Sequence, residues 1–184
     1  MNQFEQQVTG PSFIIAIVIP AMAVLLTDCK GSSPQRLISS TGEGTCASPV
    51  VLSGAKTLDS ESTSKASDTV SGEDQSCVGY KTHGSDRVYK ITVPSKDKTK
   101  LSVTVIPIQK PGPAAYDPVV YVTEDCSAQP TCSSGSDSRG GGSPEAVQYV
   151  NTTGKDKDVY VVVDGYDYQK SGGDYNLVAE FVTP

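Results

Sequence analysis

The stretch from Asp158 to Phe181 reads DVYVVVDGYDYQKSGGDYNLVAEF and contains two apolar runs. The first run, Val159–Val163, is apolar at every position, which indicates a strand that is buried on both faces. The second run, Tyr175–Phe181, largely alternates apolar with polar residues, which indicates a strand with one face in water. The stretch therefore predicts an all-β fold in which a central strand is followed by a half-exposed strand.

The segment between the two runs holds Asp, Gly and Tyr residues that suit either a turn or a binding site. Asp164–Gly165 ends the first run and Gly172–Gly173 precedes the second. These pairs favour a turn, because Asp bonds its own backbone and Gly adopts positive φ. The alternative is a site, because Tyr residues exposed in a loop stack on a sugar or a peptide. The candidate ligand-binding residues are Asp164, Tyr166, Asp167 and Tyr168.

Period-2 patterns with many β-branched and Tyr residues recur along the chain from Val50 onward. The further predicted strands are 50–58, one weak strand within 59–77, 87–93, 101–107, 117–124 and 146–151. The Gly-rich stretch 132–144 is interpreted as a flexible loop. Two half-apolar sheets must bury their faces against each other. We therefore expect residues 50–184 to form a jelly-roll or Greek-key β-sandwich of about seven to eight strands.

The charge of the chain argues against two classes of partner. The net charge is −6, and the 15 Lys and Arg residues form no block. Nucleic-acid binding depends on neutralising phosphates, and binding to an anionic membrane surface depends on a polybasic segment. Neither partner is therefore expected, apart from a membrane reached through the N-terminus.

The N-terminal segment has the features of an export signal. Phe13–Leu26 is an apolar run of 14 residues, short for a membrane-spanning helix but suited to a secretory signal. The following LLTDCKGS resembles the lipobox of bacterial lipoproteins, in which the Cys, here Cys29, carries the lipid. A plain cleaved signal and an uncleaved anchor are the alternatives, since Asp28 stands where a small residue is usual. Residues 1–28 are thus interpreted as the signal and 29–49 as a flexible tether.

The cysteine count supports export. Five Cys is an odd number, and a lipidated Cys29 leaves four for two disulfides. The sequence DCSAQPTC predicts a small loop closed by Cys126 and Cys132, and Cys46 with Cys77 follows by elimination. Free thiols in a reducing compartment are the alternative. A metal site is disfavoured, because paired C-x-x-C spacing is absent from the sequence.

The order of the strand motifs resembles the bacterial pre-peptidase C-terminal domain family, a β-sandwich of secreted and envelope proteins. The resemblance covers 66–182 and rests on DRVYKITVP, KLSVTVIP, YDPVVYV, PEAVQYVN, DVYVVVDGY and GGDYNLVAEF. It implies a module that accompanies enzymes without being catalytic itself. Some members bind calcium through carboxylates, which makes Asp86, Asp117 and Asp137 weak calcium candidates here. No other cofactor is implied.

Catalytic motifs are weak in this sequence. His83 is the only His, and the Gly-x-Ser-x-Gly motif is absent. The NTT at 151–153 is interpreted as a turn. We therefore expect a non-catalytic lipoprotein of the bacterial envelope, at the outer membrane, or a secreted form of it. Its sandwich would bind a polysaccharide or an envelope protein; the alternative is a structural or accessory subunit of an envelope or secretion assembly.

Overall fold

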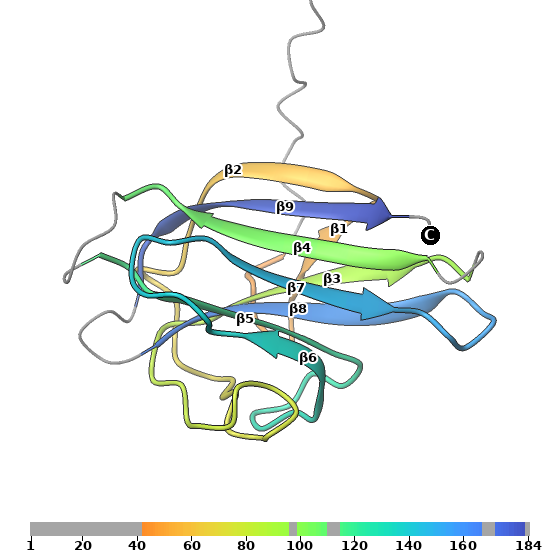
Figure 1. Cartoon of the computed structure of the whole chain (residues 1–184), viewed down its shortest axis with the longest axis horizontal. Helices are drawn as coiled ribbons and strands as arrows, with labels where there is room; N and C mark the ends of the chain where they lie inside the picture. The colour runs from red at the N-terminus through yellow and green to blue at the C-terminus, as the bar shows by residue number, and fades with distance from the viewer. Residues whose placement is uncertain (1–41, 96–98, 110–114, 167–171, 183–184) are drawn as a thin grey trace, which may run out of the picture. The chain divides into compact units, whose positions relative to one another are not determined.

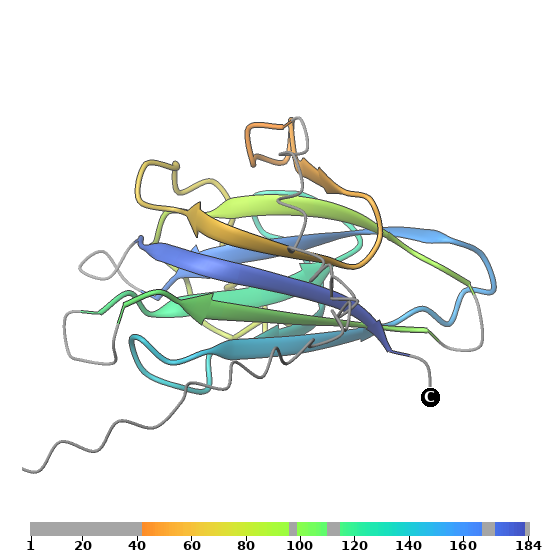
Figure 2. The same cartoon turned by 90° about the horizontal axis from the view of Figure 1, so that it is seen from above.

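The computed structural model describes residues 42–95, 99–109, 115–166 and 172–182, which form two layers of β-strands (Figure 1 and Figure 2). The described residues contain nine strands and no helix, so none of their segments is a helix that is long and apolar enough to cross a membrane. The prediction of a β-sandwich is confirmed, with nine strands where seven to eight were expected.

The strands are divided between a five-stranded and a four-stranded sheet. The five-stranded sheet has the order β1 (Val50–Leu52), β3 (Arg87–Val93), β8 (Lys157–Gly165), β5 (Pro118–Thr123) and β6 (Cys132–Ser136). The four-stranded sheet has the order β2 (Lys56–Ser62), β9 (Asp174–Val182), β4 (Lys100–Pro107) and β7 (Glu145–Val150). All neighbouring strands are antiparallel except β1 and β3, which are parallel. Most consecutive strands lie in different sheets, so the chain crosses repeatedly between the layers.

The main core lies between the two sheets, and β8 is buried on both of its faces. Val159, Val161 and Val163 of β8 belong to the main core, together with Leu101 and Leu177 of the four-stranded sheet. Val162 faces the other way and joins a second cluster, whose members include Val70, Val88, Val119 and Tyr121. β8 is also the middle strand of its sheet. The prediction of a central strand is therefore confirmed.

The second cluster exists because the long connection between β2 and β3 covers the outer face of the five-stranded sheet. This connection, residues 63–86, contains no strand, so the weak strand expected within 59–77 is confirmed only as far as the end of β2 at Ser62. Val70 is buried beneath it, and the backbone amide of Ser71 donates to the carbonyl of Ala128 at 2.8 Å. A sheet whose central strand is apolar on both sides needs such a cover to exclude water.

Two disulfides fasten distant segments together, in a pairing that differs from the predicted one. Cys46 bonds to Cys126 and Cys77 bonds to Cys132, with Cα–Cα distances of 5.4 and 4.9 Å. The predicted small loop between Cys126 and Cys132 is wrong, because Cys132 begins β6 and faces the 63–86 connection instead. Disulfides that close 80 and 55 residues restrict the unfolded chain more than a six-residue loop would. Two disulfides are consistent with an exported protein.

The sandwich begins before Val50, so part of the predicted tether is wrong. Residues 42–49 contain Cys46, and the amide of Val88 in β3 donates to the carbonyl of Gly44 at 2.8 Å. Residues 42–49 are therefore bound to the five-stranded sheet. Cys29 and the signal-like segment 1–28 lie outside the described residues, so lipid attachment stays a prediction.

Two strand assignments also need correction. The stretch 50–58 was predicted as one strand but forms β1 and the start of β2, which lie in different sheets. β6, Cys132–Ser136, was interpreted as part of a flexible loop. It pairs with β5 from Val120 to Thr123, so the hydrogen bonds of the neighbouring strand stabilise a segment that has little apolar character of its own.

Candidate binding site

The Asp-Gly-Tyr segment lies at the end of β8, beside the starts of β3 and β5. Asp164 is completely buried there. Its carboxylate accepts hydrogen bonds from the Thr82 hydroxyl at 2.5 Å, the Tyr121 hydroxyl at 3.0 Å and the Gly165 amide at 2.7 Å. Asp164 was a candidate ligand-binding residue, and this prediction is wrong, because its oxygens are engaged inside the protein.

Burial changes the acidity of Asp164. Loss of solvation raises the pKa of its carboxyl to about 7, although the hydrogen bonds from Thr82 and Gly165 act in the opposite direction. The nearby Asp86 carboxylate adds to the increase by repulsion between like charges. Near neutral pH, Asp164 therefore changes between a neutral acid and a buried anion.

Asp86 is the second buried carboxylate at this end of the sheet. It accepts hydrogen bonds from the amides of Thr69 at 2.5 Å and Val70 at 2.8 Å, and from the Thr69 hydroxyl at 2.9 Å. Burial raises the pKa of Asp86 despite these hydrogen bonds. Asp86 bonds the end of the 63–86 connection back to Thr69–Val70, and Asp164 of β8 binds the connection at Thr82. They act as structural residues of the covering segment.

The glycines of this region permit close contact between backbones. A Cβ atom added to Gly84 would lie 2.3 Å from the Cα of Gly165, and the Gly84 amide donates to the Gly165 carbonyl at 3.1 Å. A Cβ atom added to Gly173 would likewise lie 2.3 Å from the Cβ of Tyr116. Neither Gly165 nor Gly173 has positive φ. The positive φ predicted for them is therefore wrong, although they do flank the connection between β8 and β9. Gly173 is small because Tyr116 touches it.

Tyr166 follows these buried residues and points its ring toward solvent. The residue is 41% exposed and its amide donates to the Asp117 carbonyl at 3.0 Å. The ring of Tyr80, from the 63–86 connection, lies against it with a centroid distance of 5.7 Å and an interplanar angle of 68°. The exposure expected for Tyr166 is found. The other two candidates of this loop, Asp167 and Tyr168, lie outside the described residues.

The hydroxyl of Tyr80 donates a hydrogen bond to the Asp137 carboxylate, which follows β6. The segment that carries Asp137 is held in turn by Glu145 of β7, a fully buried carboxylate. Glu145 accepts hydrogen bonds from the Ser136 hydroxyl at 2.5 Å and from the Arg139 amide at 2.6 Å. Three segments that are far apart in the sequence therefore meet at Tyr80, Asp137 and Tyr166, which we call the Tyr80–Tyr166 site.

The three calcium candidates have different surroundings. Asp86 is bonded to backbone amides, Asp137 is bonded to Tyr80, and Asp117 is buried beside Tyr166. In the part of the chain that the structure describes, no three His, Cys, Asp or Glu side chains are grouped so that they can hold a metal ion. The described residues therefore do not bring the predicted calcium ligands together.

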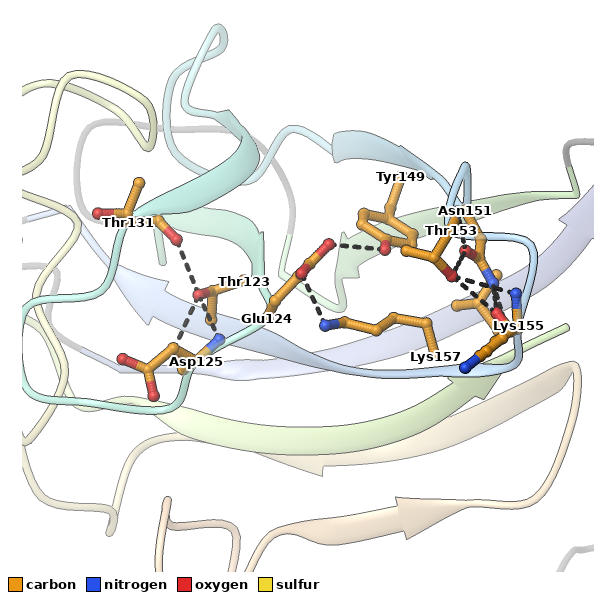
Figure 3. A network of polar contacts seen from close by, with 10 residues as sticks. Thr123, Glu124, Asp125, Thr131, Tyr149, Asn151, Thr153, Lys155 and Lys157 are labelled. Atoms are coloured by element: carbon orange, nitrogen blue, oxygen red, sulfur yellow. Dashed lines mark hydrogen bonds and ion pairs between the residues drawn. The ribbon is translucent and has the colours of Figure 1, made fainter. Parts of the chain in front are cut away.

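The opposite end of the five-stranded sheet carries a polar network that sequence reasoning missed (Figure 3). Glu124 follows β5, accepts a hydrogen bond from the Tyr149 hydroxyl at 2.9 Å and forms an ion pair with Lys157 at 2.8 Å. The hydrogen bond from Lys157 lowers the pKa of Glu124, whereas burial and the Glu124 charge raise the pKa of Tyr149 to about 12. The network connects β5, β7 and β8, and so links the two sheets.

Asn151 organises the turn beside that network, also shown in Figure 3. Its side-chain amide donates to the carbonyls of Lys155 at 2.8 Å and Val93 at 2.9 Å, and its oxygen accepts from the Thr153 amide at 3.0 Å. The interpretation of NTT as a turn is confirmed. The Asn151 side chain is buried, and its amide nitrogen already donates hydrogen bonds inside the protein.

The chain was compared with models of known protein families and with curated proteins, and neither comparison found a match. The site must therefore be interpreted from its own geometry. That geometry is an exposed Tyr packed against a half-buried Tyr that is bonded to one carboxylate, with two buried carboxylates, a close glycine contact and a disulfide nearby. Nothing in the sequence marks Tyr80, because it lies in a polar stretch without any periodic pattern.

Proposed function

We propose that this protein is a non-catalytic lipoprotein of the bacterial envelope whose β-sandwich binds a surface polysaccharide or protein. The observation that carries the proposal is the exposure of Tyr166, whose ring packs against Tyr80. Exposed Tyr rings are common in binding surfaces because they offer a large contact area at low entropic cost. The resemblance to the pre-peptidase C-terminal domain family supports the same class of function.

The membrane attachment rests on the N-terminal sequence. LLTDCKGS places Cys29 where bacterial lipoproteins carry their lipid, and the remaining four Cys form two disulfides. We place the protein at the outer membrane, with the sandwich held outside the lipid. The intact mass of the protein from its native envelope tests this. A chain that begins at acylated Cys29 is expected, and a mass that retains residues 1–28 would contradict the lipid anchor.

The test of binding is co-sedimentation with the insoluble envelope fraction of the producing cells. The full chain, extracted in mild detergent, should sediment with that fraction, and the Tyr166→Ala variant should sediment less. Val182→Ala is the matched control, because Val182 is similarly exposed but lies on β9 of the other sheet. If the wild-type chain stays in the supernatant under all salt conditions, the proposed binding function is wrong.

A structural role within a larger assembly is the second candidate, and one surface feature favours it. Val150 of β7 and Val182 of β9 are both exposed and flank Lys100 of β4 on the four-stranded sheet. Two exposed Val residues on either side of a Lys stem on one sheet suit contact with another protein. An accessory subunit should co-purify with its partners at fixed stoichiometry, and Val182→Ala rather than Tyr166→Ala should then weaken that association.

A further inference from the structure

The two sheets differ in what covers their outer faces. The 63–86 connection lies on the outer face of the five-stranded sheet, whereas the outward-facing residues of the four-stranded sheet are exposed or half-buried. In that sheet β4 lies between β9 and β7 (Figure 1). The registers of these strands place nine outward-facing residues in three rows: Lys100, Val150 and Val182; Ser102, Gln148 and Glu180; and Thr104, Ala146 and Val178. We call these nine residues the outer patch.

The outer patch holds one cation and one anion that have no charged partner among the described residues. Lys100 and Glu180 are the charged residues of the nine, and they lie on adjacent strands in adjacent rows. None of the ion pairs or side-chain hydrogen bonds between described residues includes either of them. On the five-stranded sheet, in contrast, Lys90 and Asp158 are paired at 2.7 Å. Two opposite charges on the outer patch are thus available to a partner outside this chain.

The rest of the outer patch is small and uncharged. Its other side chains are Val, Ser, Thr, Ala and Gln, so a flat surface can approach the sheet closely. Val150 and Val182 flank Lys100 and are 37% and 43% exposed. Because a partner that covers these Val residues excludes water from around Lys100, an ion pair to Lys100 would be stronger there than on an open surface.

The distribution of charge limits where a partner can lie. The outer patch has no net charge, although the whole chain has a net charge of −6. Two further acids, Asp59 on β2 and Asp174 at the start of β9, lie toward the end of the sheet opposite Lys100. A second copy that covered those acids would meet like charges, whereas one centred between Lys100 and Glu180 would not. Self-association through this face is therefore favoured at the Lys100 end.

We infer that the outer patch binds a second copy of this chain in a two-fold symmetric dimer. In a two-fold interface, each residue of one copy contacts a residue of the other copy, and the reverse contact is made as well. One unpaired Lys and one unpaired Glu suit this symmetry, because Lys100 of each copy can pair with Glu180 of the other. A different partner would have to supply both opposite charges in the matching arrangement. The inference goes beyond the proposed binding function and involves neither Tyr166 nor Cys29.

The size of the face predicts a weak dimer. Strands lie about 4.8 Å apart and residues about 3.3 Å apart along a strand, so four strands of about eight residues cover at most about 500 Å². Two such faces bury at most about 1,000 Å², which is near the lower limit for a specific interface. We therefore expect a dissociation constant on the order of 10 µM, so that monomer and dimer are both populated in dilute solution.

Sedimentation equilibrium of the full chain in density-matched detergent tests the inference. Wild type should follow a monomer–dimer equilibrium over concentrations of about 1 to 200 µM. Lys100→Glu and Glu180→Lys should each weaken dimerisation at least about 10-fold, because each substitution turns two ion pairs into two like-charge contacts. Lys81→Glu makes the same change in net charge as Lys100→Glu, at an exposed residue of the 63–86 connection, and should dimerise as wild type does.

A mixture of the two single variants distinguishes contact between copies from an effect within one copy. Lys100→Glu presents two acidic groups and Glu180→Lys presents two basic groups, so a dimer with one copy of each has two ion pairs again. An equimolar mixture should therefore dimerise within about 3-fold of wild type, although each variant alone does not. The double variant with both substitutions should also recover dimerisation. Circular dichroism and thermal unfolding show whether each variant is folded.

Four results would overturn the inference. One is a wild-type chain that stays monomeric at about 200 µM. The second is dimerisation that both single substitutions leave unchanged, which would place the contact on another surface. The third is an equimolar mixture of folded variants that fails to dimerise, since Lys100 and Glu180 would then not meet across the interface. The last is a monomeric wild type from which Lys100→Glu releases a co-purifying protein, because the outer patch would then bind a different partner.

Discussion

Replacement of Asp164 by Asn should remove a specific pH dependence of stability. Asp164 is buried, and its pKa of about 7 lies above its ordinary value of 3.8. The folded protein therefore binds this proton more tightly than the unfolded chain does. The stabilisation that results is fully present below about pH 4 and is lost as the pH rises through 7.

The magnitude follows from the two pKa values. At pH 5, a carboxyl with a folded pKa of about 7 and an unfolded pKa of 3.8 stabilises the protonated folded state by roughly 3 kcal/mol. At pH 8, nearly all of that contribution is gone. The change in Asp164 alone should therefore lower the free energy of unfolding by roughly 3 kcal/mol between pH 5 and pH 8.

Asn suits the same place. Its carbonyl oxygen can accept the hydrogen bond of the Gly165 amide, and its NH₂ group can donate to the oxygens of Thr82 and Tyr121, whose hydroxyls rotate. Asp164→Asn should thus be folded and should become more stable relative to wild type as the pH rises. Asp86 keeps its raised pKa in both proteins, so the comparison must use the difference between the two curves.

Urea unfolding of both proteins at pH 5, 6, 7 and 8 measures this difference, with the disulfides kept intact. Far-UV circular dichroism is a suitable signal, because the chain has no Trp. Asp125→Asn, a change of an exposed Asp, serves as the control and should follow wild type. Parallel curves for wild type and Asp164→Asn would refute the reasoning, since they would mean that Asp164 has a similar pKa in the folded and unfolded chain.

Glu145→Ala should lower the free energy of unfolding by about 2 kcal/mol, because the half-buried Ser136 hydroxyl and the amides of Ser138 and Arg139 would lose their acceptor; urea unfolding measures this. Gly84→Ala should cost about 2 kcal/mol in the same assay, because its Cβ would overlap the β8 backbone, whereas Gly140→Ala, where a Cβ has open space, should cost less than about 0.5 kcal/mol. Loss of the 55-residue disulfide in a Cys77→Ser and Cys132→Ser double variant should lower stability by about 4 kcal/mol, measured as a lower melting temperature; an unchanged melting temperature would contradict the structural role given to this bond.

The strands that the sequence predicted best are those with a clear apolar run or a clear alternation of apolar and polar residues. β8 is apolar at every position from Val159 to Val163, and this alone identifies a strand covered on both faces. β4 alternates Leu101, Val103 and Val105 with polar residues, and its buried face is the one that the alternation selects. In these strands the local pattern and the tertiary environment agree.

The features that sequence missed depend on partners elsewhere in the chain. β6 has the sequence CSSGS, and it is a strand because β5 offers it hydrogen bonds along an edge. The disulfide pairing follows from which segments cross the outer face of the five-stranded sheet, and four Cys allow three pairings from sequence alone. Tyr80 joins Tyr166 only because the 63–86 connection is bound to that face.

The Asp-Gly-Tyr segment shows why a choice between turn and site was too simple. Asp164 is buried and binds the neighbouring connection through Thr82, and the backbone of Gly165 lies against Gly84, which has no side chain to prevent the contact. Tyr166, the next residue, is partly exposed at the surface, where its ring packs against Tyr80. The first two residues have structural roles, and these roles fix the position of the third. A short polar segment after a buried strand can therefore contain both structural residues and surface residues suited to binding. Only the burial of each side chain tells the two kinds of residue apart.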